Sequence, residues 1–366
     1  MTRTLLVSDL HLGTRSGADV LRLPGALERL LAALDGVDRL VLLGDVVELR
    51  GGPLAGALAA ARPVFDALAR KLDGRDLILV PGNHDHALLA PWLERRVEPL
   101  GAEQFVAPAD ASAAAAELLR PIEGARLAYP GFWVAEHVYA THGHYLDVHV
   151  TVPSFERLAV GALVRARGSR TAQARSANDH EAVLAPIYAW IHSAAQQGSR
   201  HANGGGGARA WKALTGAPGR RRSLRQLALG AGFTAAVGAL NGAGFGPLRR
   251  DLSAAEIRRA SLQAFGEVLE GLEVDAAHAV FGHTHRTGPL DGPLERWRTP
   301  SGTHLHNTGS WVYETHFMAN AKPANPYWPG GAVLVDGGAP PRGLRLLGDL
   351  TAQELAGSRP ASKQTP

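Results

Sequence analysis

The chain has 366 residues, of which 45% are hydrophobic and 20% are charged, and it contains no cysteine. This balance supports a buried core and excludes wholesale disorder, while the lack of cysteine excludes disulfides, thiolate zinc sites and cysteine nucleophiles. The formal net charge of +4 is unevenly distributed, because residues 151–260 hold sixteen Arg or Lys against five Asp or Glu, a balance of +11 that leaves −7 for the remainder.

The first 150 residues have the pattern of alternating strands and helices. We expect helices at 26–34 and 55–72, and strands at 5–7, 39–43, 76–80, 126–129, 132–135 and 138–141. The strands at 126–129 and 132–135 are expected to be joined by a turn at Pro130-Gly131. This order predicts an α/β fold with functional side chains at the carboxyl ends of strands. Since the strand at 5–7 follows Met1 closely, without a signal-peptide pattern, we predict a cytoplasmic protein.

From about residue 151 the pattern changes. Helices are expected at 154–167, 181–196 and 253–272, the last with Ser253 as N-cap and Glu256 at the N3 position. Strands return at 278–281, 305–307 and 332–336, and the polar tail from Thr351 is expected to fray. We therefore predict a core in two parts, 1–150 and 275–350, a basic, mostly helical cap insertion at 151–274, and a disordered tail at 351–366.

The insertion contains an uncharged run at 226–248, between arginine clusters. Its length permits a membrane span, but six glycines and Asn241 oppose one. A membrane span, a cap that contacts a membrane surface or acyl chains, and an ordinary buried helix or loop stay open as alternatives.

The positive charge of 151–260 suggests an anionic partner, either a phosphate-bearing substrate or an acidic membrane surface at the inner face of the membrane. A solvated arginine-rich surface is the plain alternative. Nucleic acid is not favoured, because no stripe of interleaved aromatic and basic residues is present.

Five short blocks rich in Asp and His follow apolar, strand-like runs. They are Asp9-Leu10-His11, Gly44-Asp45, Gly82-Asn83-His84-Asp85, His142-Gly143-His144 and Gly282-His283-Thr284-His285. In extended backbone, residues two apart such as Asp9 and His11 point the same way, and the two oxygens of Asp45 can bridge two metals. The set suits a two-metal hydrolytic site, in which ions about 3.5–4 Å apart stabilise the entering and leaving oxygens of phosphoryl transfer. Mixed imidazole and carboxylate ligands favour two divalent ions such as Mn²⁺, with Fe²⁺ and Zn²⁺ as alternatives.

These blocks, extended to Ser8–Gly13, Gly44–Glu48 and Thr141–His144, resemble the signature of calcineurin-like metallophosphoesterases. The resemblance covers residues 1–150 and about 275–340. It implies a four-layer α-β-β-α sandwich with the metals at one edge. It also implies that Asp9, His11, Asp45 and His285 hold the first metal, and that Asp45, Asn83, His142 and His283 hold the second.

The same resemblance implies that a metal-bridging hydroxide attacks phosphorus in line, and that His84, oriented by Asp85, protonates the leaving oxygen or stabilises its charge. His84 is also, apart from His144, the block histidine without a ligand role. We assign His144, His86 and Arg286 to substrate binding, with contacts behind the metal ligands as the alternative for the two histidines. Glu48 is left open between orienting a ligand and being solvated.

Three blocks are also similar to those of UDP-2,3-diacylglucosamine pyrophosphohydrolases, which carry a helical, lipid-accommodating cap between the fourth and fifth blocks. This chain departs from them at His84, where they typically have arginine, at His144, where they have an acidic residue, and in its longer insertion.

We therefore predict a dinuclear-metal phosphoesterase that hydrolyses a phosphoester or pyrophosphate bond in a phosphorylated small molecule or in a nucleotide-linked lipid or sugar. Phosphodiesterase or phosphomonoesterase activity on soluble nucleotides or nucleic acid is the alternative. A non-catalytic scaffold of the same fold and a membrane-recruitment module are less favoured.

Overall fold

The computed structural model describes residues 2–149, 175–197, 238–242, 254–290, 297–315, 318 and 322–357. Within these residues ten strands form one sheet in the order β10-β9-β1-β2-β3-β5-β6-β7-β8, with β4 beside β5. The strands are β1 (Arg3–Val7), β2 (Arg39–Leu42), β3 (Asp76–Leu79), β4 (Glu103–Val106), β5 (Arg126–Ala135), β6 (Val138–Thr141), β7 (His278–Phe281), β8 (His304–Asn307), β9 (Gly331–Asp336) and β10 (Arg342–Arg345).

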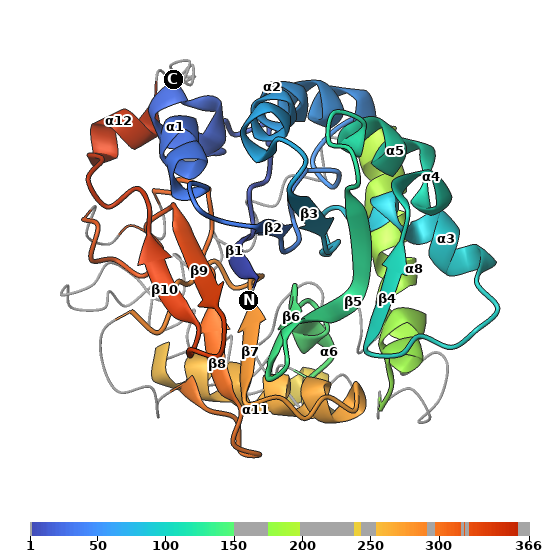
Figure 1. The fold of residues 1–366 in the computed structure, drawn as a ribbon. Coiled ribbons are helices and arrows are strands. Elements are labelled where there is room, and N and C mark those ends of the chain that lie inside the picture. The colour runs from blue at the N-terminus through green and yellow to red at the C-terminus, as the bar shows by residue number, and fades with distance from the viewer. Residues whose placement is uncertain are drawn as a thin grey trace.

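The helices lie outside the strands, as Figure 1 shows. They are α1 (Pro24–Ala33), α2 (Leu54–Leu72), α3 (Ala90–Arg95), α4 (Pro108–Ala111), α5 (Ala113–Leu119), α6 (Leu146–His149), α8 (Ala177–Gln196), α11 (Ala254–Gly271) and α12 (Ala352–Ala356), with 3₁₀ helices at Val20–Arg22 and His86–Leu88. In α2, buried residues such as Leu58, Phe65 and Leu68 recur at helical spacing and turn one face of the helix to the core.

The sheet has two apolar faces because strand side chains alternate. Leu5 and Leu40 pack in the larger core beneath the helices, whereas Leu6 and Val41 share an inner cluster with Val280 of β7. This inner cluster lies between strands from the two ends of the sheet, with α1 and α2 outside one part and α6 and α11 outside the other (Figure 1). The predicted α/β sandwich is confirmed.

The strand β5 differs from its prediction. Residues 126–135 form one strand without a Pro130-Gly131 turn. The early part of β5 pairs with β3, whereas Gly131 to Ala135 pair with β6. A Cβ at Gly131 would collide with the carbonyl of Ala140. Pro130 and Gly131 therefore mark a change of partner within one strand, which local turn chemistry does not reveal.

The segment after Thr351 was expected to fray, and this is wrong for its described part. Thr351 and Glu354 form a reciprocal capping box at the start of α12, and Leu355 is buried. The sequence analysis also missed β4, β10 and the short helices α3 to α5. Residues 358–366 lie outside the described residues.

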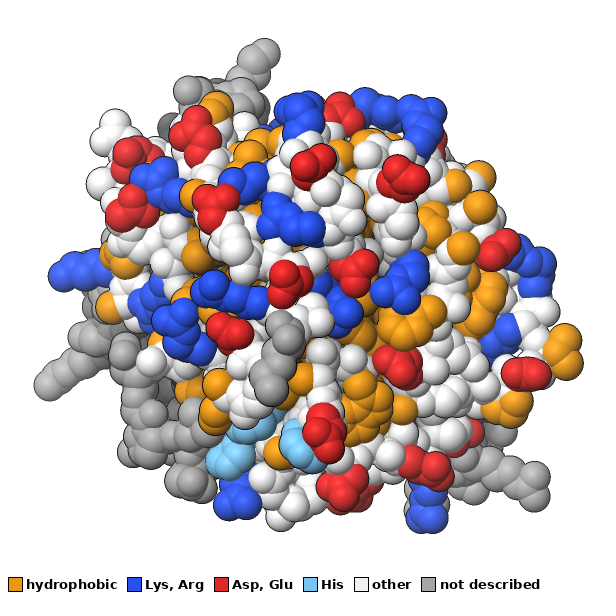
Figure 2. Space-filling model, in the orientation of Figure 1, with side chains coloured by type: hydrophobic (Ala, Val, Ile, Leu, Met, Phe, Trp, Pro, Cys, Tyr) orange, Lys and Arg blue, Asp and Glu red, His pale blue; other side chains and the backbone are white. Residues whose placement is uncertain are grey.

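The predicted insertion is described in part. Its helices at 181–196 and 253–272 correspond to α8 and α11, whereas the predicted helix at 154–167, the cap Ser253 and most of the run at 226–248 lie outside the described residues. The strand before the insertion, β6, pairs in parallel with the strand after it, β7. In the described part of the chain, no helix combines the length and apolar character needed to cross a bilayer. Over the helices at the top of the view, Figure 2 shows Lys and Arg side chains interspersed with Asp and Glu.

Candidate metal centre

All five blocks follow strands, as the sequence predicts. The strands β1, β2 and β3 are mutually parallel, as are β6 and β7, so the blocks come together where these strands end. At two glycines, the lack of a side chain lets the backbone lie directly against the converging side chains. A Cβ at Gly44 would enter the ring of His142, and a Cβ at Gly82 would collide with both the Asp45 carboxylate and that ring.

The first group of converging side chains is Asp9, His11 and His285. His285 Nε2 lies 3.2 Å from Asp9 Oδ1 and 3.2 Å from His11 Nε2. Asp9 Oδ2 accepts the backbone N–H of His283, whereas the buried Oδ1 has no hydrogen-bond partner. A buried carboxylate oxygen without a donor is costly, and a cation between these three atoms would satisfy it.

The second group is Asp45, His142 and His283. Asp45 Oδ2 lies 3.3 Å from His142 Nε2 and 3.8 Å from His11 Nε2 of the first group. The same carboxylate oxygen therefore faces both groups. This geometry fits the predicted bridging role of Asp45.

Asn83 lies beside the second group. Its Oδ1 is 3.3 Å from His142 Nε2 and 3.2 Å from His283 Nδ1, and it also faces Asp45 Oδ2. Two acceptor oxygens face to face are unfavourable unless a cation lies between them. With the carboxamide turned over, its nitrogen donates to Asp45 and its oxygen accepts from Arg50 Nη1 at 2.7 Å. The first orientation is the one that a metal would select.

The donor set fits two divalent ions. Carboxylate, amide and imidazole atoms converge in these two groups and in an overlapping third group of His11, Asp45 and His84, and the shared Asp45 oxygen lies between the first two. Such mixed ligands suit Mn²⁺, Fe²⁺ or Zn²⁺. The residues that would hold the first ion are Asp9, His11, Asp45 and His285, and those for the second are Asp45, Asn83, His142 and His283.

Two carboxylates contact the candidate imidazole ligands on the side away from the centre. Glu48 is buried, and its Oε2 lies 3.2 Å from His11 Nδ1 and 2.8 Å from His84 Nδ1. Asp147 Oδ1 lies 3.1 Å from His283 Nε2. Carboxylates at this position fix the ring and its tautomer and raise its basicity. The open question about Glu48 is thereby answered in favour of an orienting role, and Asp147, five residues after His142, was missed.

Burial and charge act against each other on these rings. Burial would lower the pKa of His11, but the Glu48 hydrogen bond and the Asp45 charge raise it to about 9. Burial likewise opposes protonation of His142, yet Asp45 raises the pKa of this ring to about 10. Burial also opposes ionisation of Glu48, but His84 and His11 outweigh it and hold the pKa of this carboxyl below its usual range. Without metal, protons therefore compete for the imidazole ligands.

Asp85 does not orient His84 as predicted. Its buried carboxylate accepts the backbone N–H groups of Gly82, Asp45 and Val46 at 2.6, 3.3 and 2.7 Å. Burial and the nearby Asp45 raise the pKa of Asp85 to about 6. Asp85 therefore ties the loop after β3 to the loop after β2. The carboxylate that contacts the His84 ring is Glu48, and His84 Nε2 lies 4.0 Å from Asp45 Oδ2.

His86 and His144 were assigned to substrate binding, but both are buried. His86 Nε2 lies 3.0 Å from Glu181 Oε2, and His144 Nε2 lies 3.1 Å from the Tyr129 hydroxyl. Burial, and then the neighbouring His142, lower the pKa of His144 well below its usual value. Their contacts favour the alternative role behind the ligands.

Glu181, which the sequence analysis did not single out, joins helix α8 to the core. Its carboxylate contacts His86 and accepts hydrogen bonds from the hydroxyls of Tyr129 and Tyr145. Nothing in the local sequence distinguishes this residue from a solvated helix glutamate, because its partners are 36 to 95 residues away along the chain.

Arg286, the third residue assigned to substrate binding, is half-buried and its guanidinium lies over the Trp297 ring at 5.8 Å. Its role in substrate binding stays a prediction.

The backbone of most candidate ligands is not extended. Five of them, Asp9, His11, Asp45, His283 and His285, have φ between 45° and 66°. The expectation that extended geometry aligns Asp9 with His11 is therefore wrong, although both side chains do reach the same point. Left-handed backbone in successive turns after β1 directs them there.

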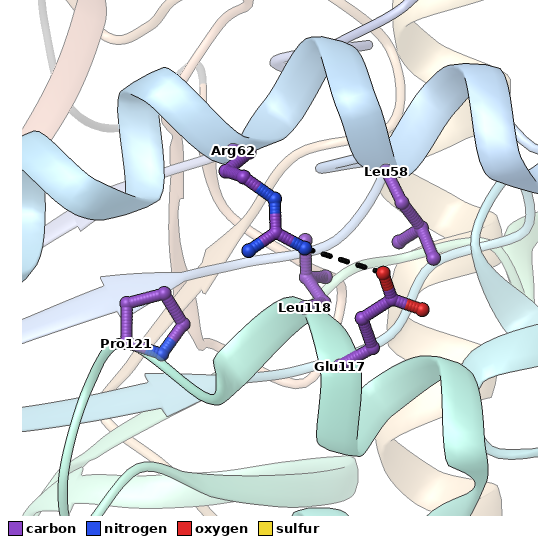
Figure 3. Close-up of a pocket in the computed structure, with 5 residues that line it drawn as sticks. All are labelled: Leu58, Arg62, Glu117, Leu118 and Pro121. Carbon is purple, nitrogen blue, oxygen red and sulfur yellow. Dashed lines mark hydrogen bonds and ion pairs between the residues drawn. The ribbon is translucent and has the colours of Figure 1, made fainter.

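A separate surface pocket lies between α2 and α5, where Arg62 and Glu117 form an ion pair at 3.2 Å (Figure 3). None of its lining residues belongs to the ligand set.

The family model described as calcineurin-like phosphoesterase matches residues 2–192. A comparison with curated proteins found no match. Among solved structures, a cold-active protein-tyrosine phosphatase of a psychrophilic Shewanella species is 15% identical over 92% of this chain and 76% of its own, with a TM-score of 0.28. A dimetal phosphatase from Danio rerio is 13% identical over 94% of this chain and 99% of its own, with a TM-score of 0.33. TM-scores this low carry no argument about this chain.

Proposed function

The chain belongs to the calcineurin-like phosphoesterase family, whose model covers more than half of it, and from this premise we propose that it hydrolyses a phosphoester or pyrophosphate bond with two divalent ions. Metal-dependent phosphoesterase chemistry follows from the family and from the clustered ligands. We propose Mn²⁺ as the ion, with Fe²⁺ and Zn²⁺ as alternatives.

The observation that carries the proposal is the position of Asp45 Oδ2. It lies within 3.8 Å of an imidazole nitrogen in each group, His11 Nε2 in one and His142 Nε2 in the other. One carboxylate oxygen shared by two groups of imidazoles is suited to a pair of ions and not to a single ion. When bound, two such ions would activate water and stabilise charge on the phosphate.

Side chains of the protein would orient the imidazoles and supply a proton. Glu48 holds His11 and His84 through their Nδ1 atoms, so the Nε2 atom of each ring is directed toward the Asp45 side of the centre. His84 is more exposed than the ligands around it, with 27% of its side chain accessible. It is therefore placed to meet a substrate and to give a proton from Nε2 to the leaving oxygen.

For the substrate, we propose a nucleotide-linked lipid or sugar, supported by the sequence similarity to pyrophosphohydrolases at three blocks. Soluble nucleotides or simple phosphate esters are the second candidate. A non-catalytic scaffold is disfavoured because all seven ligand residues are present and grouped.

Turnover by metal-reconstituted protein tests the proposal. The protein is freed of metal, loaded with Mn²⁺, Fe²⁺ or Zn²⁺, and assayed on bis-p-nitrophenyl phosphate, p-nitrophenyl phosphate, UDP-glucose and a UDP-acyl-sugar. Asp45→Asn, which keeps the shape of the side chain, is the matched inactive variant. Turnover that needs metal and is absent in Asp45→Asn supports the proposal. A fully loaded protein that hydrolyses none of the four compounds refutes it.

We also propose, from the charge of residues 151–260 alone, that the protein binds the anionic inner face of a membrane peripherally. Co-sedimentation with phosphatidylglycerol vesicles, and with phosphatidylcholine vesicles as control, tests this. If equal amounts of protein sedimented with the two kinds of vesicle at low salt, membrane binding through charge would be contradicted.

A further inference from the structure

Three histidines that have no role in the candidate metal centre lie together on neighbouring strands. His278 is the first residue of β7, and His304 and His306 are the first and third residues of β8. The two strands are parallel, and His278 lies directly opposite His304. Because strand side chains alternate between the faces of a sheet, all three imidazoles lie on one face. His283 and His285 follow the other end of β7 (Figure 1), so this β7–β8 histidine cluster is separate from the candidate centre.

The face that carries the cluster is the inner one. Val280, two residues after His278, belongs to the inner apolar cluster, whereas Leu305 packs in the larger core. The His306 residue is 1% exposed, and His278 and His304 are partly exposed. The cluster is therefore open to ions from solvent on one side and closed by the sheet on the other.

Two nitrogens of the cluster are already at the spacing of two ligands of one ion. His278 Nδ1 lies 3.1 Å from His306 Nε2. Two imidazole nitrogens on a tetrahedral Zn²⁺, each about 2.0–2.1 Å from the ion, are about 3.3 Å apart. A zinc ion would therefore need only a small shift of these two rings.

The third ring has a nitrogen that nothing satisfies. The His304 ring stacks beside the His278 ring, with their centroids 5.5 Å apart. Its Nδ1 atom is buried and has no hydrogen-bond partner among the described residues, which is costly for a polar atom. The backbone around it is held, since the His304 N–H donates to the Ala277 carbonyl at 2.9 Å and the His278 N–H to the His137 carbonyl at 3.0 Å. Rotation of one side chain would therefore bring this nitrogen to the other two.

The electrostatics of the cluster favour a metal over a proton. Burial, and then the neighbouring His278 and His304 rings, lower the pKa of His306 to about 3. Burial, and then His304, also lower the pKa of His278. These shifts favour the neutral imidazole, which is the form that binds metals. Imidazole ligands suit Zn²⁺, Cu²⁺ and Ni²⁺, whereas Mg²⁺ and Ca²⁺ prefer oxygen ligands.

We propose that the β7–β8 histidine cluster binds one Zn²⁺ ion through His278 Nδ1, His306 Nε2 and His304 Nδ1, with water in the fourth position. On binding, the ring that donates the hydrogen bond between His278 and His306 moves its proton to its other nitrogen. The ion then joins the first residues of β7 to β8. The proposal does not depend on the proposed function, because none of the three histidines is a candidate ligand of the dinuclear centre.

The zinc content of matched variants tests the site. The wild type, His278→Gln, His304→Gln and His306→Gln are equilibrated with Zn²⁺, desalted and analysed by plasma mass spectrometry. The wild type is expected to keep one equivalent more than each variant, whatever the dinuclear centre retains. His137→Gln is the matched control, because its side chain is 72% exposed and its backbone carbonyl, which holds His278, is unchanged.

Affinity and spectroscopy identify the ligands. In competition with a chromophoric chelator, each of the three variants should bind this equivalent more weakly by a factor beyond the about 10- to 100-fold that loss of a group behind a ligand costs. With Co²⁺ in place of Zn²⁺, the difference spectrum between the wild type and His306→Gln should show the strong visible bands of four-coordinate cobalt. Circular dichroism without added metal shows which variants are folded, and His278→Gln and His304→Gln, at partly exposed positions, decide the outcome if His306→Gln is not.

The site is overturned if the wild type keeps no more zinc than the folded variants, if His137→Gln loses the same equivalent, or if the cobalt difference spectrum lacks these bands. A protein that shows the extra zinc but hydrolyses no phosphate ester would leave the site standing and refute the proposed function.

Discussion

Replacing Glu48 with Gln is expected to weaken both metal binding and turnover without unfolding the protein. The Glu48 side chain is 9% exposed, and its Oε2 lies 2.8 Å from His84 Nδ1 and 3.2 Å from His11 Nδ1. Gln keeps the shape of Glu48 but removes its charge. The Gln side chain has one acceptor oxygen and one donor nitrogen. It can therefore accept hydrogen bonds from only some of the groups that contact the two oxygens of Glu48.

The size of the effect follows from those two contacts. Loss of a carboxylate behind a metal-binding imidazole typically costs about 10- to 100-fold in metal affinity or activity. Because His11 is a predicted ligand and His84 a predicted proton donor, we expect about that loss in the affinity of the first metal, and a similar further loss in kcat at saturating metal. The Glu48 hydrogen bond also raises the pKa of His11, so in the metal-free variant this ring should lose its proton at a lower pH.

The assay separates the two effects. Metal affinity is measured by competition with a chromophoric chelator, and kcat is measured on p-nitrophenyl phosphate at saturating Mn²⁺. Glu117→Gln, at the exposed partner of Arg62, controls for the loss of one negative charge. Unchanged metal affinity together with unchanged kcat in Glu48→Gln would refute the orienting role of Glu48.

Three further substitutions test other parts of the structure. His84→Gln should lower kcat about 10²- to 10⁴-fold with both metals bound, more on phenyl phosphate than on p-nitrophenyl phosphate, and an equal loss on both esters would exclude the proton-donor role. Glu181→Gln should lower the free energy of unfolding in urea by about 2 kcal/mol, because it weakens the hydrogen bonds of two buried tyrosine hydroxyls, and an unchanged midpoint would contradict this. Burial, and then His149, lower the pKa of His180 to about 4, below the 6.5 of the unfolded chain. His180 therefore contributes stability that is present above pH 6.5 and is lost, by up to about 3 kcal/mol, as the pH falls toward 4. Melting temperatures of His180→Gln should depend less on pH across this window, and parallel curves would refute the assignment.

The candidate ligands could be located from sequence because each one lies within four residues of the end of a strand. For Asp45 after β2 and His142 after β6, it was enough to identify an apolar run and the block that follows it. The strand pairing then brings them together, since the carboxyl ends of parallel strands meet at one edge. The fold class therefore predicts that these side chains lie near one another, whereas the turns after the strands decide where each one points.

The residues behind the ligands could not be assigned in the same way. Asp147 contacts His283 from 136 residues away, and Glu181 contacts His86 from 95 residues away. Neither stands in a block or after a strand, so their sequence surroundings resemble those of solvated acidic residues. Asp85 was assigned the wrong partner for the opposite reason. It is the sequence neighbour of His84, but the carboxylate that contacts the His84 ring is that of Glu48.

The backbone conformation of the candidate ligands follows from hydrogen bonds between the loops that carry them. Five ligand residues, Asp9, His11, Asp45, His283 and His285, have left-handed φ values, a conformation that costs non-glycine residues about 1–3 kcal/mol each when the surroundings impose it, and less for Asp and His. The surroundings here are the hydrogen bonds between loops, such as those from Asp9 N to Gly44 O and from His11 N to Asp45 O, both 2.9 Å. These bonds join backbone to backbone and hold the loops after β1 and β2 together without using any side-chain ligand atom. The left-handed turns are therefore built into the protein frame, which directs the candidate ligand side chains toward the same point.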